Sequence, residues 1–116
     1  MLLKIFFKEE KKEIKIDTKD IINKEIKQRF DYIILNINNF SREIFYREIS
    51  IFLRFVISKN ILNNNIFFMT ITEVKNNIKS EFVEDLEKVY FLEFNHNLED
   101  SIDVRKNILE KIKNKL

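Results

Sequence analysis

The single histidine, His96, is the residue whose type most readily does acid–base chemistry near neutral pH. It stands between two asparagines, Asn95 and Asn97, in a stretch typical of a loop. A catalytic histidine needs a nucleophile or a carboxylate close by in space, and the sequence does not identify one. With no cysteine, a zinc site would take nearly all its ligands from carboxylates. We therefore interpret His96 as a solvated loop residue and expect no catalytic residue, no metal and no cofactor.

The absence of glycine excludes the familiar nucleotide-binding loops. The P-loop and the Gly-x-Gly-x-x-Gly turn both need glycine where the backbone approaches phosphate. Glu-x-Lys segments such as Glu13-Ile14-Lys15 would suit a nuclease whose metal is held by carboxylates, but a chain with 16 lysines produces such matches by chance. The sequence thus predicts a protein that is not an enzyme, with a metal-dependent nuclease kept as an alternative.

Acidic side chains gather in one part of the chain. Residues 81–104 carry eight acids and one lysine, whereas the whole chain has a net charge of +2. The candidate partner-binding acids, which we expect in the second half of a helix, are Glu81, Glu84, Asp85 and Glu87. The helix dipole disfavours anions there, and Glu81 and Asp85 form a like-charge i,i+4 pair. Violations of local rules tend to mark functional positions, so these acids indicate a surface for a basic protein partner.

The basic residues indicate an alternative site. Arg47 and Arg54 are seven residues apart and share one side of an expected helix, where arginine suits phosphate contacts. Lysines crowd the C-terminal helix end, a position that the helix dipole also favours for cations. A nucleic-acid-binding module would use Arg42, Arg47, Arg54, Lys111, Lys113 and Lys115. The small net charge of +2 argues against strong general affinity for nucleic acid.

These patterns lead to a hypothesis about function. We interpret the chain as a small non-enzymatic protein-binding domain that presents an acidic helix face to a basic partner. Proteins that handle nucleic acid carry basic grooves, so an inhibitor or accessory subunit of such a protein fits. A phage or mobile-element product that blocks a host-defence nuclease is one concrete version. The alternative is the nucleic-acid-binding module described above.

The elements that position these residues follow from the spacing of apolar residues. The segments 2–7 and 13–16 alternate as two short strands of an N-terminal hairpin. Apolar steps of three and four predict a helix from Asp17 or Thr18 to Ile37. A second helix, over 42–59 with Ser41 as its N-cap, is apolar around most of its circumference. Such a helix belongs at the centre of a fold or in a homodimer interface.

The second half of the chain alternates between strand and helix patterns. The β-branched and aromatic run 66–72 predicts a buried strand. Thr72 is expected to cap a third helix that reaches Leu86, and 89–94 either continues it or, as we prefer, forms a fourth strand. A last helix runs from about Ser101 to the end. Together these segments predict a helix-rich α+β fold, in which a small mixed sheet packs with about four helices. The alternative is an all-α bundle with an N-terminal hairpin.

Composition bounds the molecule as a whole. The 116 residues fit a single domain, residues 1–116, and 45% of them are hydrophobic, enough for a packed core. The chain lacks Gly, Ala, Pro, Cys and Trp, and this composition is typical of an AT-rich genome. No stretch approaches the ~20 apolar residues of a membrane span, and the N-terminus does not read as a secretory leader. We expect a cytoplasmic protein that does not contact membranes.

Overall fold

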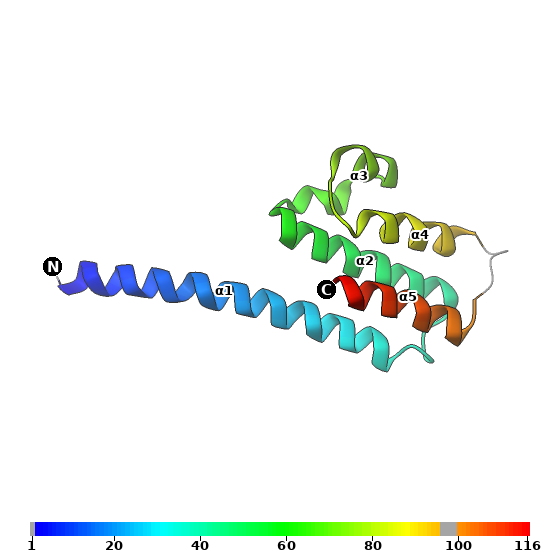
Figure 1. The fold of residues 1–116 in the computed structure, drawn as a ribbon, viewed down its shortest axis with the longest axis horizontal. Coiled ribbons are helices and arrows are strands. Elements are labelled where there is room, and N and C mark those ends of the chain that lie inside the picture. Colours follow the sequence, from blue (N-terminus) through cyan, green and yellow to red (C-terminus); the bar gives the residue numbers. More distant parts are fainter. Residues whose placement is uncertain (1, 96–99) are drawn as a thin grey trace.

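The computed structural model describes residues 2–95 and 100–116, with side chains described from Lys19 onward. Its elements are α1 (Leu2–Leu35), α2 (Arg42–Ile61), the short 3-10 helix η1 (Asn64–Phe68), α3 (Ile71–Asn77), α4 (Val83–Phe94) and α5 (Ile102–Lys115). In Figure 1, α4 lies between α2 and α3, and α1 runs along the opposite side of α2. The N-terminal part of α1 extends beyond the other helices.

The predicted α+β fold is wrong, because the described residues contain no strand. α1 runs without interruption through 2–7 and 13–16, so the N-terminal hairpin is wrong as well, and the all-α part of the alternative describes the fold better. The reason lies in the connection 9–12, which reads Glu-Glu-Lys-Lys. It holds none of the Asn, Asp or Gly residues that a tight hairpin turn requires. A continuous helix needs no turn and satisfies its backbone groups internally.

The two later strands are also replaced by helices. The run 66–72 divides between η1 and the start of α3, where the side chain of Thr70 accepts a hydrogen bond from the Glu73 N–H at 3.2 Å. The segment 89–94 continues α4, as the helical alternative anticipated. Its apolar residues Val89 and Leu92 are buried, which extends a three-residue spacing and not the two-residue period of a strand.

The third helix predicted from Thr72 to Leu86 is in fact two helices, α3 and α4. The chain becomes extended at Ile78, with φ −113° and ψ 126°. The Ser80 hydroxyl then accepts a hydrogen bond from the Phe82 N–H at 3.2 Å just before α4 begins at Val83. This break moves the acidic residues that follow it from the end of one helix to the start of another.

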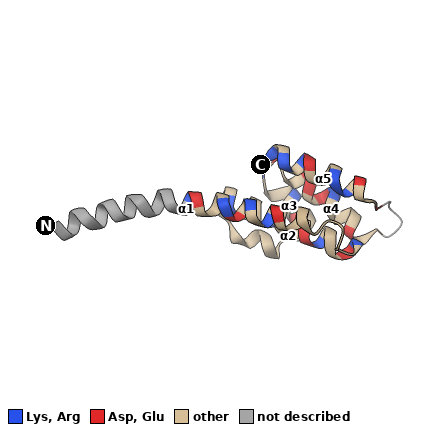
Figure 2. Ribbon diagram, turned by 90° about the horizontal axis from the view of Figure 1, so that it is seen from below, with Lys and Arg blue, Asp and Glu red and all other residues tan. Residues whose placement is uncertain are grey.

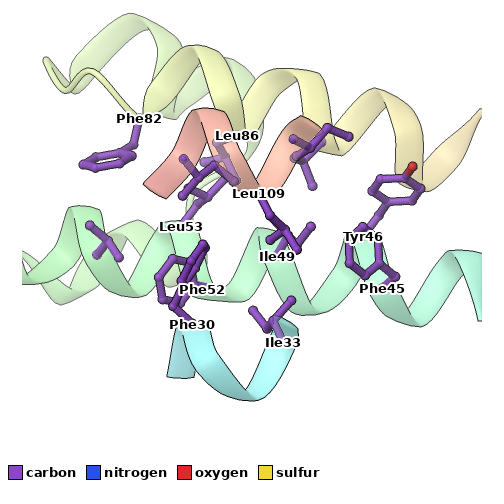
Figure 3. Packing of buried hydrophobic residues seen from close by; sticks show 14 of the residues in the cluster. Phe30, Ile33, Phe45, Tyr46, Ile49, Phe52, Leu53, Phe82, Leu86 and Leu109 are labelled. Atoms are coloured by element: carbon purple, nitrogen blue, oxygen red, sulfur yellow. The ribbon is translucent and has the colours of Figure 1, made fainter. Parts of the chain in front are cut away.

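The core is built around α2. Figure 3 shows Ile49, Phe52 and Leu53 of α2 between Phe30 of α1 and Leu86 of α4. Leu109 of α5 is buried in the same cluster. The sequence predicted that the apolar second helix lies at the centre of the fold or in a homodimer interface. In the structure this helix, α2, lies at the centre of the fold. Because α1 and α4 both pack onto α2, the packing determines which side of each of these helices faces solvent.

The described part of the chain includes no helix that is both long and apolar enough to cross a membrane.

Candidate protein-interaction surface

The side of α4 that faces away from α2 carries the most exposed aromatic residues of that helix. Glu84, Glu87, Phe91 and Phe94 follow each other at steps of three, four and three residues, so they share one side of the helix. Phe91 is 57% exposed, Phe94 62% and the adjoining Tyr90 37%. We call these five residues the α4 outer surface.

The three rings of this surface contact one another. The centroids of Tyr90 and Phe94 are 4.8 Å apart, and those of Tyr90 and Phe91 are 6.5 Å apart with the rings nearly perpendicular. Such geometries are the favourable ones for aromatic pairs. The rings therefore form one exposed apolar cluster and not three scattered side chains, and contiguous exposed apolar surface is typical of protein–protein contacts.

A shallow pocket of about 320 Å³ adjoins the rings, between α3 and α4. Its lining residues are Ile71, Thr72, Lys75, Asn76, Glu87, Tyr90 and Phe91. Glu87 accepts a hydrogen bond from the Lys75 ammonium at 3.3 Å across this pocket. The pocket thus combines an apolar residue, two aromatic rings and one carboxylate.

The structure changes the reason for choosing the four candidate acids. Because α4 begins at Val83, Glu84 and Asp85 lie in its first turn and Glu81 precedes it. The helix dipole favours anions at that position. The expected conflict between these acids and the dipole is therefore absent. The start of α4 therefore explains where these acids lie. The expectation differed because the sequence spacing did not reveal the break between α3 and α4.

Two of the four acids have lysine partners within the chain. The Lys115 ammonium lies 2.7 Å from the Asp85 carboxylate and also donates to the Glu81 carbonyl at 3.2 Å. The hydrogen bond to Asp85 raises the pKa of Lys115. Glu87 is paired with Lys75, as described above. Glu81 and Glu84 are exposed. The four acids therefore do not form one open acidic face.

The arginines of the alternative site are largely occupied by the protein itself. Arg54 donates to the carbonyls of Ile66 and Met69, which fastens η1 to α2. Arg42 donates to the Asn95 carbonyl at 2.6 Å. The exposed Arg47 lies 4.0 Å from a carboxylate oxygen of Glu93 on α4.

The lysines of that alternative do not complete a basic surface. Lys111 and Lys113 are exposed on α5, whereas Lys115 is paired with Asp85. In Figure 2, basic and acidic residues alternate along α5 and along the coloured part of α1, so these described residues do not separate by charge. This arrangement does not favour binding to a phosphate backbone, which requires clustered cations.

Arg105 was not among the residues predicted from the sequence, and it is only 6% exposed. Its guanidinium makes two hydrogen bonds to the Asp100 carboxylate, at 2.9 and 2.7 Å, and donates to the carbonyls of Ile37 and Phe40 at 2.8 and 2.9 Å. It also lies over the ring of Phe45, 4.6 Å from the centroid. Arg105 thus joins the start of α5 to the connection between α1 and α2.

A signal for Arg105 was present in the sequence. It precedes Ile108, Leu109 and Ile112 by three, four and seven residues, so it falls on the apolar side of its helix. A charged residue on the apolar side of a helix is buried only where it has an ion-pair or hydrogen-bond partner. Those partners come from distant parts of the chain, so the spacing alone could not identify them.

Tyr46 and Asp100 complete this buried cluster. The Tyr46 hydroxyl donates to an Asp100 carboxylate oxygen at 3.1 Å. Burial, followed by the nearby negative charge of Asp100, raises the pKa of Tyr46 to about 12. The hydrogen bonds from Arg105 lower the pKa of the Asp100 carboxyl. The donors of the cluster have protein acceptors, as buried polar groups in folded proteins generally do, so the cluster links these parts of the chain.

Among the described side chains, no group of three or more His, Cys, Asp or Glu residues is arranged to hold a metal ion. His96 lies outside the described residues. Comparison of the chain with protein-family models, with curated protein sequences and with solved structures finds no match.

Proposed function

We propose that this chain is a small non-enzymatic protein-binding domain whose partner contacts the α4 outer surface. The observation that carries the proposal is the cluster of Tyr90, Phe91 and Phe94, which keeps more than a third of each side chain exposed. Leaving such rings in water is unfavourable, and their burial by a partner is worth roughly 25 cal/mol per Å² of apolar area. Aromatic residues, phenylalanine included, are also enriched at protein–protein interfaces relative to the rest of the surface.

The chemistry of the partner follows from the residues beside the rings. Glu84 and Glu87 occupy the same side of α4, about two turns and one turn before Phe91, respectively. A complementary segment would place apolar side chains on the rings and a basic side chain toward these carboxylates. The proposal therefore keeps a basic partner but moves the centre of the contact from the acids to the rings. An inhibitor or accessory subunit of a nucleic-acid-handling protein remains one specific form of it.

The first prediction tests the rings with matched variants. Phe91→Ala combined with Phe94→Ala should weaken partner binding by roughly 30-fold or more, because hot-spot truncations cost about 2 kcal/mol or more. The control is Leu35→Ala, which removes a 79% exposed side chain from α1. Parallel affinity capture with the three proteins identifies a partner as a protein retained by wild type and control but lost by the double variant. Isothermal titration with that partner then measures the change in Kd.

Charge provides a second readout on the same complex. Glu84→Lys should slow association, and the effect should shrink as salt is added, since it acts through long-range attraction. Glu110→Lys, at an exposed position of α5, should not. Circular dichroism and a thermal melt establish that each variant is folded. Retention of the same proteins by wild type and by the Phe91/Phe94 double variant would contradict the proposal.

A further inference from the structure

We infer that the pocket between α3 and α4 receives an arginine side chain of the partner. This inference rests on the proposed function and specifies the chemistry of one contact within it. The pocket, of about 320 Å³, is at the lower end of the size of small-molecule sites, which suits one long side chain and not a whole helix. Its residues offer what a guanidinium needs: a flat ring, a carboxylate and an apolar contact for the stem.

The pocket supplies each of these three groups. Tyr90 and Phe91 line it with aromatic rings, and Glu87 contributes a carboxylate to the same lining. Ile71, which is partly buried against the core, provides apolar surface for the methylene groups. A guanidinium can stack on a ring and bond a carboxylate with two parallel N–H groups at once. An ammonium has no flat face and binds a carboxylate as a point charge.

The chain uses the same arrangement for its own arginines. Arg105 lies over Phe45, 4.6 Å from the ring centroid, while it bonds Asp100. Arg29 lies over Phe55, 4.0 Å from the centroid, while it bonds Glu25 at 3.2 Å. In both places a ring and a carboxylate hold one guanidinium. The pocket between α3 and α4 has the rings and the carboxylate, but the cation beside Glu87 is a lysine.

In the free protein, Lys75 pairs with the Glu87 carboxylate, and the arginine of the partner would take its place. Its side chain is 60% exposed and that of Glu87 is 31% exposed, so the pair is accessible to solvent. Exposed ion pairs contribute little to stability, so an arginine that also stacks on the rings can displace Lys75 from the carboxylate. The free protein is thus predicted to bind arginine more weakly than a variant without Lys75.

The test uses defined small probes and does not depend on knowing the partner. ¹⁵N-labelled protein is titrated with arginine blocked at both ends, and with blocked citrulline and blocked lysine as matched probes. Citrulline keeps the length and the flat end group of arginine but has no charge. The expected result is a saturable shift of the amide signals of α3 and of residues 87–91 with arginine, a much weaker response to lysine and none to citrulline.

Two variants locate the contact. Glu87→Gln should weaken arginine binding by roughly tenfold or more, because hydrogen bonds between charged groups are lost. Lys75→Gln should strengthen it by about two- to threefold, which is the range of an exposed ion pair. The control is Glu110→Gln on α5, which should leave the titration unchanged. Unchanged binding in Glu87→Gln, or equal responses to arginine and citrulline, would overturn the inference.

These outcomes are separable from those of the proposed function. If arginine fails to bind while the Phe91/Phe94 double variant still loses the partner, the arginine pocket is wrong and the interaction surface stands. If that double variant retains the partner, the proposed function is wrong whatever the titration shows.

Discussion

At the scale of single residues, one buried polar cluster connects three parts of the chain. It consists of Arg105, Asp100 and Tyr46. Arg105 and Asp100 have side chains that are only 8% and 15% exposed. Loss of one partner from such a buried pair leaves an uncompensated charge and costs about 3–5 kcal/mol. The same chemistry on an exposed surface would contribute less than about 1 kcal/mol. The contribution of this cluster to stability therefore depends on its burial and not on the residue types alone.

Tyr46 provides a pH-dependent test of this cluster. Its pKa is raised from 10.0 to about 12 in the folded protein, so the unfolded chain loses the phenolic proton first as the pH rises. The free energy of unfolding should therefore fall between pH 10 and about 12, by on the order of 2 kcal/mol from this group. Tyr46→Phe lacks this contribution, so the advantage of wild type over the variant should decline across that range.

Denaturant unfolding at several pH values measures this difference. The matched control is Tyr32→Phe, which removes a hydroxyl from a side chain that is 54% exposed on α1. The decline for Tyr46→Phe should exceed any change for this control. An equal change in the two variants would show that the phenol is not buried beside Asp100.

At the scale of elements, α3 shows how one short helix is positioned by its cap. Thr70 accepts a hydrogen bond from the Glu73 N–H at 3.2 Å, and its hydroxyl donates to the Glu73 carboxylate at 3.1 Å. Thr72, which the spacing indicated as the cap, is followed by Lys75 at the corresponding position. A lysine cannot accept the hydrogen bond that closes a capping box. Which of the two threonines acts as the N-cap of α3 thus depends on the residue three positions later.

The two threonines supply a matched pair of variants. Thr70→Ala should lower the free energy of unfolding by about 1 kcal/mol, the usual cost of losing an N-cap. Thr72→Ala should change it by less than about 0.5 kcal/mol, because Thr72 is an exposed residue inside the helix. Midpoints of denaturant unfolding measure both. A larger loss in Thr72→Ala would place the start of α3 two residues later than the structure does.

At the scale of the whole molecule, stability depends on α2. Ile49 is fully buried and Phe52 is 3% exposed, whereas Ile51 on the same helix is 43% exposed. Ile49→Ala and Phe52→Ala should each cost about 2–5 kcal/mol, and Ile51→Ala less than about 0.5 kcal/mol. Denaturant midpoints measure these losses. They should not depend on protein concentration, because one chain buries both residues. Concentration-dependent midpoints would show that a second copy completes the core.

Much of the fold was predictable where the information is local. Apolar residues at steps of three and four identified most of α2 and α5, and part of α1. Ser41 was predicted as the N-cap of α2, and its side chain accepts a hydrogen bond from the Ile44 N–H at 3.4 Å. The prediction of four strands was wrong, because runs of isoleucine and phenylalanine suit a buried helix as well as a strand.

The candidate site was less predictable than the helices. The acidic residues could be identified because many of them lie close together in the sequence. Whether they lie at the start or the end of a helix depended on a helix break at 78–82. Val74 of α3 and Phe82, the residue just before α4, are buried on either side of that break, and such packing is not visible in spacing. Phe91 and Phe94 were visible as aromatic residues, but their exposure depends on which side of α4 the other helices leave uncovered.

The sequence by itself determined which segments form most of the helices and that Ser41 caps α2. These properties depend on residues within one or two turns of each other, so neighbours in the chain suffice. Only the tertiary structure decided that Arg105 bonds the Ile37 carbonyl 68 residues away and that the rings of α4 face outward. Hydrophobic burial has no direction, so a helix with apolar residues on two sides does not specify which side is covered. The packing of the other helices against α2 and α4 makes that choice, and with it determines the surface on which a partner can bind.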